Sequence, residues 1–179
     1  MRLVTLDRDG VINCDRNAFI KNPDEWKPIP GSLDEIANLT QSIYRVAVAT
    51  NQSGIGRGLL DMAALNAINK KMSKAVNQIG GCIDAVFFCP HTQLDQCNCR
   101  KPESGLFKDI AEHFCLDLKG APAIGDSLSD LQAATSVGAI PLLALTGKNK
   151  ETQSTDNLPL NTQVYSDLAQ EIDNLTGKT

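Results

Sequence analysis

The sequence predicts a three-layer α/β fold, in which helices cover both faces of a mostly parallel sheet. Short apolar stretches alternate along the chain with longer stretches whose apolar residues recur at helical spacing. The short stretches are continuously apolar, as expected of strands that are buried on both faces. The chain has 179 residues, which suits one domain. We therefore expect residues 1–179 to form a single domain without a large cap domain.

Residue types that begin or end helices and strands indicate the boundaries of the elements. Ser32 follows a Pro-Gly pair and is expected to cap the first long helix, while Asp61 is expected to cap the second, which Gly80 ends. The strands are apolar runs that stop at polar residues or glycine, and the alternation is that of a Rossmann-like domain. In chain order we expect a strand at 3–6, a helix at 32–42, a strand at 45–49, a helix at 61–79, a strand at 83–88, a helix at 104–114, a strand at 121–124, a helix at 128–137, strands at 139–144 and 162–165, and a helix at 167–175.

Composition and charge narrow the possible partners. Apolar residues make up 42% of the chain and charged residues 21%, which is typical of a globular protein. The net charge is −4, so we expect no binding of nucleic acid. The longest apolar stretches, 83–89 and 139–145, are too short to span a bilayer, and no signal-peptide pattern is present. We expect a cytoplasmic protein that has no membrane partner and acts as a monomer.

Polar and reactive residues follow four of the predicted strands. They are Asp7-Arg8-Asp9-Gly10, Thr50-Asn51-Gln52-Ser53, Arg100-Lys101 and Gly125-Asp126-Ser127. The carboxyl ends of parallel strands meet at one edge of a sheet, where ligands bind in α/β folds. Carboxylates suit Mg²⁺, and a lysine with glycine-flanked backbone amides suits a phosphoryl group. The sequence therefore predicts a magnesium-dependent phosphoryl-transfer site at this edge.

These four segments resemble, in order and spacing, the motifs of the haloacid dehalogenase superfamily of phosphatases. The resemblance implies that Asp7 is the nucleophile and Asp9 the general acid and base. It also implies that Thr50 and Lys101 contact the phosphoryl group, and that Mg²⁺ is held by Asp7, Asp9 and Asp126. Asp130 is expected to be a helix cap or a partner of Lys101, with neither role preferred.

Four potential metal ligands form a separate cluster in the loop over 89–101. Cys89 and His91 form one pair, and Cys97 and Cys99 form a second pair five residues further on. Three thiolates and an imidazole suit tetrahedral Zn²⁺ and leave no open position for water, so we expect a structural zinc site. We expect the other cysteines to be core residues, at Cys82 and Cys115, or partly exposed, at Cys14.

Further motifs resemble the histidinol-phosphatase branch of the superfamily. They are DRDGVIN at 7–13, TNQSGIGRG at 50–58, the cysteine loop and CRKP at 99–102. The enzymes of this branch lack the large cap, so the resemblance implies that loops select the substrate. The substrate-binding residues it implies are Asp15, Arg16, Asn17, Ala18, Asn51, Gln52, Ser53, Arg100 and Ser127.

Two kinds of substrate are known in this branch, namely a heptose bisphosphate used for lipopolysaccharide precursors and histidinol phosphate. Arg100, Arg16, Lys21 and Arg57 would make the rim of the site basic. A basic rim suits a second phosphate, so we expect a phosphorylated sugar as substrate and keep histidinol phosphate as the alternative. A more remote alternative is a zinc-stabilised binding module without catalytic activity.

Overall fold

The elements of the structure follow the predicted order closely. The computed structural model describes residues 2–15, 19–146 and 157–177. Its strands are β1 Arg2–Leu6, β2 Tyr44–Asn51, β3 Ala85–Cys89, β4 Pro122–Gly125, β5 Ile140–Ala144 and β6 Gln163–Tyr165. Its helices are α1 Ser32–Gln41, α2 Met62–Gln78, α3 Gly105–Phe114, α4 Leu128–Ser136 and α6 Leu168–Thr176, with short 3-10 helices η1 Pro23–Glu25 and η2 Gln93–Asp95.

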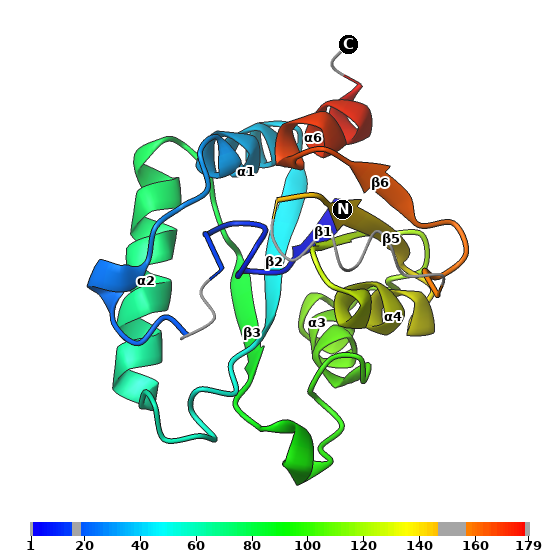
Figure 1. The fold of residues 1–179 in the computed structure, drawn as a ribbon. Coiled ribbons are helices and arrows are strands. Elements are labelled where there is room, and N and C mark those ends of the chain that lie inside the picture. The colour runs from blue at the N-terminus through cyan, green and yellow to red at the C-terminus, as the bar shows by residue number, and fades with distance from the viewer. Residues whose placement is uncertain (1, 16–18, 147–156, 178–179) are drawn as a thin grey trace.

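Within the described residues, the strands form one six-stranded sheet in the order β3-β2-β1-β4-β5-β6, and every neighbouring pair is parallel. The chain moves outward from β1 to β3 and then returns to the other side of β1 with β4 (Figure 1). The carboxyl ends of β1 and β4 therefore flank the position where the winding reverses, which is the usual ligand site of such sheets. The predicted three-layer α/β fold is confirmed.

Helices cover both faces of the sheet because successive strand residues point to opposite sides. Val46 and Val48 of β2 pack in the core cluster beneath α1, α2 and α6. Ala47 and Ala49, which alternate with them, pack beneath α3 and α4 on the other face. Figure 1 shows α2 to the left of the sheet, nearest to the green β3, and α3 and α4 together on the other side.

One predicted cap is wrong. Gly31, not Ser32, precedes the first helical residue, and its φ of 83° suits glycine. Ser32 is buried and donates from Oγ to the Ile12 carbonyl oxygen at 2.6 Å, so it ties α1 to the loop after β1. Asp61 caps α2 as predicted, because its side chain accepts from the Ala64 N–H.

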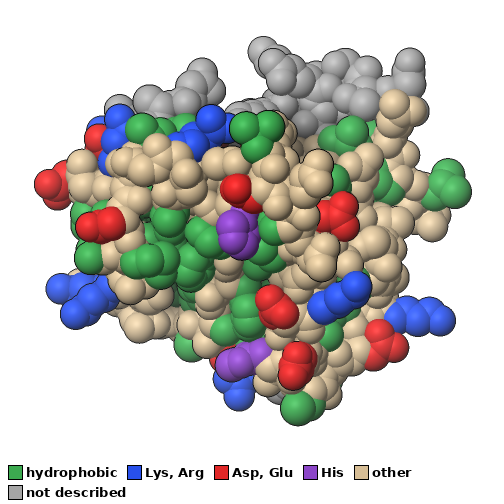
Figure 2. Space-filling model, turned by 90° about the horizontal axis from the view of Figure 1, so that it is seen from below, with side chains coloured by type: hydrophobic (Ala, Val, Ile, Leu, Met, Phe, Trp, Pro, Cys, Tyr) green, Lys and Arg blue, Asp and Glu red, His purple; other side chains and the backbone are tan. Residues whose placement is uncertain are grey.

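One face of the molecule is of mixed charge (Figure 2). Figure 2 shows one face on which the acidic and basic side chains are interspersed, without a continuous field of either sign. Among the described residues, no helix combines the length and the apolar character needed to cross a membrane.

Candidate active site

A cavity of about 300 Å³ opens at the carboxyl end of the sheet. It collects residues from the turns after β1, β2 and β4 and from the loop after β3, as the strand ends predict. Its lining comprises Asp7, Asp9, Asp15, Phe19, Ile20, Thr50, Asn51, Gln52, Ser53, Arg100, Lys101, Asp126, Ser127, Ser129 and Asp130.

Asp7 and Lys101 form the centre of this cavity. Lys101 Nζ lies 3.0 Å from Asp7 Oδ1 and 2.5 Å from Asp130 Oδ1, and it donates to the Ala49 carbonyl oxygen at 2.7 Å. The Lys101 side chain is almost completely buried. Burial alone would lower the pKa of Lys101, but the carboxylates of Asp130 and Asp7 outweigh it and the pKa is raised. The lysine is therefore a fixed cation beside Asp7.

Asp7 itself lies among other acidic groups. Burial raises its pKa well above the usual value, Lys101 lowers it, and Asp130, Asp126 and Asp9 raise it further. Carboxylate oxygens of Asp7, Asp126 and Asp130 lie within 4.8 Å of one another. Opposite ligands of Mg²⁺ are about 4.2 Å apart, so this concentration of negative oxygens fits a divalent cation.

Asp130 has both of the roles that the sequence left open. Its Oδ1 pairs with Lys101, and its Oδ2 accepts from the N–H and the hydroxyl of Ser127 at 3.0 and 2.5 Å, which caps α4. Asp130 is thus held by Lys101 on one oxygen and by Ser127 on the other.

Two glycines allow these acidic groups to approach the backbone. A Cβ at Gly10 would lie 2.3 Å from Asp126 Oδ2, and the φ of Gly10 is 89°. A Cβ at Gly125 would lie 2.2 Å from Asp130 Cβ. Both distances are too short for any other residue, so each glycine is required for the packing of the carboxylates.

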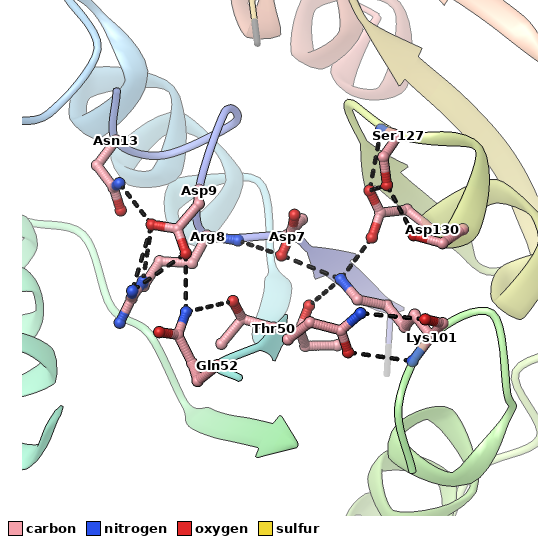
Figure 3. A network of polar contacts seen from close by, with 12 residues as sticks. Asp7, Arg8, Asp9, Asn13, Thr50, Gln52, Lys101, Ser127 and Asp130 are labelled. Carbon is pink, nitrogen blue, oxygen red and sulfur yellow. Dashed lines mark hydrogen bonds and ion pairs between the residues drawn. The ribbon is translucent and has the colours of Figure 1, made fainter. Parts of the chain in front are cut away.

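Asp9 points away from Lys101 into a separate group of donors (Figure 3). Arg8 Nη2 lies 3.1 Å from Asp9 Oδ2. The Arg8 side chain is fully buried, although both of its neighbours in the sequence, Asp7 and Asp9, line the cavity. Asn13 donates to Asp9 Oδ1 at 2.8 Å and Gln52 to Oδ2 at 2.7 Å. Asp9 remains partly exposed, with 23% of its side chain accessible, so it faces the cavity from a rigid support.

The end of β2 fixes both the hydroxyl of Thr50 and the backbone of Lys101. Gln52 Nε2 lies 2.9 Å from Thr50 Oγ1. The Asn51 side chain accepts from the Lys101 N–H at 3.0 Å and donates to the Lys101 carbonyl oxygen at 3.1 Å. This two-point contact positions the lysine, a role that the sequence did not suggest. Gln52 and Ser53 are buried beside the cavity.

The predicted zinc ligands come together in the loop after β3. Cys89 Sγ lies 3.6 Å from Cys97 Sγ and 2.9 Å from Cys99 Sγ, and His91 Nδ1 lies 3.3 Å from Cys99 Sγ. Burial raises the pKa of the Cys89 thiol to about 12. Burial alone would raise the pKa of the Cys97 thiol as well. Hydrogen bonds from the Arg100 N–H and the neighbouring thiols outweigh it and lower this pKa to about 7. The four atoms lie within 4.8 Å of one another, which fits a tetrahedral metal.

Most of the predicted site residues line one cavity, but not all can be placed. Arg16, Asn17 and Ala18 lie outside the described residues. Phe19 and Ile20 line the cavity and were not predicted, since an apolar residue in a loop has no signal of its own. The expectation that Cys82 and Cys115 are core residues is wrong, because both are exposed. Cys82 lies in the loop between α2 and β3, and Cys115 directly follows α3.

Comparisons with known proteins agree with this geometry. Residues 98–170 match the family model described as "HAD-hyrolase-like". The D-glycero-beta-D-manno-heptose-1,7-bisphosphate 7-phosphatase of Bordetella bronchiseptica is 54% identical over 169 residues, which cover 94% of each chain. The enzyme of the same name from Pseudomonas aeruginosa is 47% identical over 93% of each chain.

Solved structures of heptose bisphosphate phosphatases are also similar to this chain. The D,D-heptose 1,7-bisphosphate phosphatase from B. bronchiseptica, complexed with magnesium and phosphate, has a TM-score of 0.97 and 51% identity, with 100% of each chain covered. The corresponding structure from Burkholderia thailandensis has a TM-score of 0.79 and 48% identity, covering 99% of this chain and 100% of the other. The chain therefore belongs to the haloacid-dehalogenase-like phosphatases and, within them, to the family of the D-glycero-beta-D-manno-heptose-1,7-bisphosphate 7-phosphatases.

Proposed function

We propose that this chain removes the 7-phosphate of D-glycero-D-manno-heptose 1,7-bisphosphate through a covalent phosphoryl bond to Asp7. The observation that carries the proposal is the Asp7 carboxylate, which lies 3.0 Å from the buried cation of Lys101 in a cavity shared with Asp9 and Asp126. Relatives that are about half identical over nearly their whole length are named for this reaction. The product would serve the synthesis of lipopolysaccharide precursors.

In the first step, a carboxylate oxygen of Asp7 attacks the phosphorus atom. The bond between phosphorus and the sugar oxygen breaks, and Asp9 gives a proton to that oxygen, so the sugar leaves as an alcohol. Lys101 and the Thr50 hydroxyl contact the phosphoryl oxygens, with the backbone amides after β2 beside them. The products of this step are the dephosphorylated sugar and an aspartyl-phosphate.

In the second step, water attacks the phosphorus atom of the aspartyl-phosphate and gives a proton to Asp9. The bond between phosphorus and the Asp7 oxygen breaks, which releases inorganic phosphate and restores both carboxyl groups. Asp9 therefore acts first as an acid and then as a base. Its place beside Asp7, on a separate set of donors, suits it to both steps.

We infer that Asp7 and Asp126, with the Asp9 carbonyl oxygen, hold Mg²⁺. The ion supplies positive charge that screens the repulsion between the carboxylate and the phosphoryl group. The oxygens of Asp7 and Asp126 lie close enough for one ion, and a related structure is complexed with magnesium and phosphate.

We further infer that Cys89, His91, Cys97 and Cys99 hold a structural Zn²⁺. Three sulfurs and one ring nitrogen are the donors of structural zinc sites, and here they lie within 4.8 Å of one another, which is compatible with one shared ion. The loop that they would fix leads directly to Arg100 and Lys101. We propose that residues 1–179 act as one catalytic domain, as a monomer in the cytoplasm, on a small phosphorylated sugar rather than on nucleic acid or a membrane.

Substrate choice is assigned to the residues around the cavity mouth. Arg100 lines the cavity next to Lys101, and its planar fork can bind two oxygens of the distal phosphate. Asp15, Gln52, Ser53 and Ser127 line the same cavity and would contact the sugar or its phosphate. Arg16, Asn17 and Ala18 complete the proposed substrate loop.

A substrate panel with two arginine variants tests this proposal. Phosphate release should be faster from heptose bisphosphate than from histidinol phosphate. Arg100→Ala should lower kcat/KM for the heptose bisphosphate. The loss of transition-state stabilisation should be about 1–3 kcal/mol, typical of losing a charged hydrogen-bond partner. Arg2→Ala, at the opposite end of β1, is the matched control and should leave kcat/KM unchanged. Faster turnover of histidinol phosphate would overturn the substrate assignment and leave the phosphatase chemistry in place.

A further inference from the structure

The two carboxylate oxygens of Asp9 have different surroundings. Oδ1 accepts from Asn13 Nδ2 at 2.8 Å and from Arg8 Nε and Nη2 at 3.3 and 3.2 Å. Oδ2 accepts from Gln52 Nε2 at 2.7 Å and from Arg8 Nη2 at 3.1 Å. Figure 3 shows Asn13 and Gln52 approaching Asp9 from different sides. The difference matters because a proton on a carboxyl oxygen is stabilised where a neighbouring group can accept it. Arg8 Nη2 contacts both oxygens and so does not distinguish them.

The amide of Asn13 has only one acceptable orientation. Its Oδ1 accepts from Trp26 Nε1 at 3.0 Å, and this contact is buried. An indole N–H can donate but never accept, so Trp26 requires the oxygen of the Asn13 amide on its side. The NH₂ group must then face Asp9 Oδ1. Asn13 is fully buried and also donates to the Cys14 carbonyl oxygen at 3.1 Å, which fixes the same orientation.

The amide of Gln52 is not restricted in this way. Its Nε2 contacts Asp9 Oδ2 and, at 2.9 Å, the hydroxyl of Thr50. A hydroxyl group can either donate or accept. Gln52 could therefore turn its amide and accept both from Thr50 and from a proton on Oδ2. The contact from Gln52 to Oδ2 can reverse its direction, whereas the contact from Asn13 to Oδ1 cannot.

We propose that Asn13, oriented by Trp26, is a positioning residue that keeps Asp9 Oδ1 as a permanent acceptor and so makes Oδ2 the oxygen that exchanges the proton in both steps. The proposal rests on the role of Asp9 proposed above. It gives a function to the segment between β1 and α1, because Trp26 belongs to that segment and reaches Asp9 through the Asn13 side chain alone. Arg8, whose Nη1 lies 3.3 Å from Asn69 Oδ1 on α2, contacts both oxygens of Asp9.

The test uses phosphate esters whose leaving groups differ in acidity, because only poor leaving groups need a proton. For each variant, log kcat/KM is plotted against leaving-group pKa, from nitrophenyl and phenyl phosphates to alkyl phosphates and the heptose bisphosphate. Asn13→Asp presents an acceptor to Oδ1 and should lower kcat/KM on alkyl esters by roughly 100-fold, as expected when general acid catalysis is lost. Nitrophenyl phosphate should be affected far less, so the slope becomes steeper.

Trp26→Phe keeps an aromatic ring and removes the N–H that orients Asn13. It should steepen the slope in the same direction but less than Asn13→Asp. The slope compares substrates on one enzyme preparation, so it does not depend on the fraction of protein that is folded. Ser32→Ala is the matched control, because Ser32 forms a buried hydrogen bond to the same loop without contact to Asp9. It should leave the slope unchanged.

Asp9→Asn separates this inference from the proposed function. If Asp9→Asn retains wild-type turnover of alkyl phosphates, the acid and base assignment itself is wrong. If Asp9→Asn is inactive on them, but Asn13→Asp and Trp26→Phe lower all esters by the same factor, Asp9 keeps its role and the positioning inference is overturned. Steeper slopes in both variants, with an unchanged slope for Ser32→Ala, support it.

Discussion

At the scale of single residues, the site depends on two carboxylates that are close in sequence and have different partners. Asp7 pairs with Lys101, and Asp9 is held by Arg8 and uncharged amides. The residue between them, Arg8, is buried and pairs with Asp9 rather than with Asp7. The alternation of side chains around the turn thus gives each carboxylate its own environment. One group can remain a nucleophile while the other exchanges protons.

Glu171 is a buried acidic residue outside the site that contains Asp7 and Asp9. It lies in α6, its side chain is fully buried, and neither carboxyl oxygen has a hydrogen-bond partner. Burial raises its pKa to about 9, with a further contribution from Asp167. The folded protein therefore keeps a proton on Glu171 at pH values where the unfolded chain has lost it.

This retained proton makes stability dependent on pH. From the ordinary glutamate pKa near 4.5 up to about 9, the free energy of unfolding should fall as pH rises, by at most about 1.4 kcal/mol per pH unit. Glu171→Gln stays neutral, so its stability relative to the wild type should increase between pH 5 and pH 8. Urea unfolding at both values measures the change. Glu112→Gln, at an exposed position of α3, is the control; an equal pH dependence in both variants would contradict this account.

The residues that we propose to be catalytic were easier to find in the sequence than the residues that support them. A local sequence pattern is enough to find Asp7, Asp9 and Lys101, because they follow strands in a recognisable order. The contacts from Asn13 to Asp9 and from Trp26 to Asn13 depend on how the insert folds back, which no short pattern encodes.

At the scale of elements, the cysteine loop connects a proposed metal site to Lys101, the proposed catalytic lysine. Cys99 and Lys101 are two residues apart, and Asn51 holds the Lys101 backbone from β2 at two points. The loop is thus fixed at one end by β2, and the metal would fix the other end. Movement of the loop would shift Lys101 relative to Asp7.

Loss of one of the proposed zinc ligands should therefore lower activity through the position of Lys101. Cys97→Ser should reduce the zinc content and lower kcat, because a catalytic group that is displaced by even a small distance loses most of its effect. Elemental analysis and phosphate release measure both quantities. Cys82→Ser, at an exposed cysteine outside the cluster, should change neither. Wild-type protein that contains no zinc after purification from unchelated buffers would refute the structural-zinc proposal.

The elements themselves were predictable to within a few residues, because helical and strand periodicity is a local property. The exact ends of the elements were harder to predict. Ser32 has the residue type of a cap, but the chain uses Gly31 at a positive φ and turns the serine hydroxyl toward Ile12. A tertiary hydrogen bond overrides the local preference here, and only the packing of α1 on the loop after β1 explains it.

At the scale of the whole molecule, the order of the strands decides where the chemistry takes place. β1 lies between β2 and β4, so the turns that carry Asp7, Thr50 and Asp126 meet at one edge of the sheet. The alternation of strands and helices predicts a parallel sheet, and the strand order 3-2-1-4-5 is common among such folds. The insert after β1 could not be placed in advance, because it has no periodicity, and residues 16–18 of it lie outside the described part of the chain.

The central claim is that the phosphoryl group passes through Asp7. The direct measurement is rapid acid quenching of the enzyme during turnover of heptose bisphosphate with Mg²⁺, followed by mass analysis of its peptides. We predict that the peptide containing Asp7 gains the mass of one phosphoryl group at that residue, and that Asp7→Asn gains none and has lost turnover by orders of magnitude. Full turnover without phosphorylated enzyme, or with the phosphoryl group on another residue, would contradict the account.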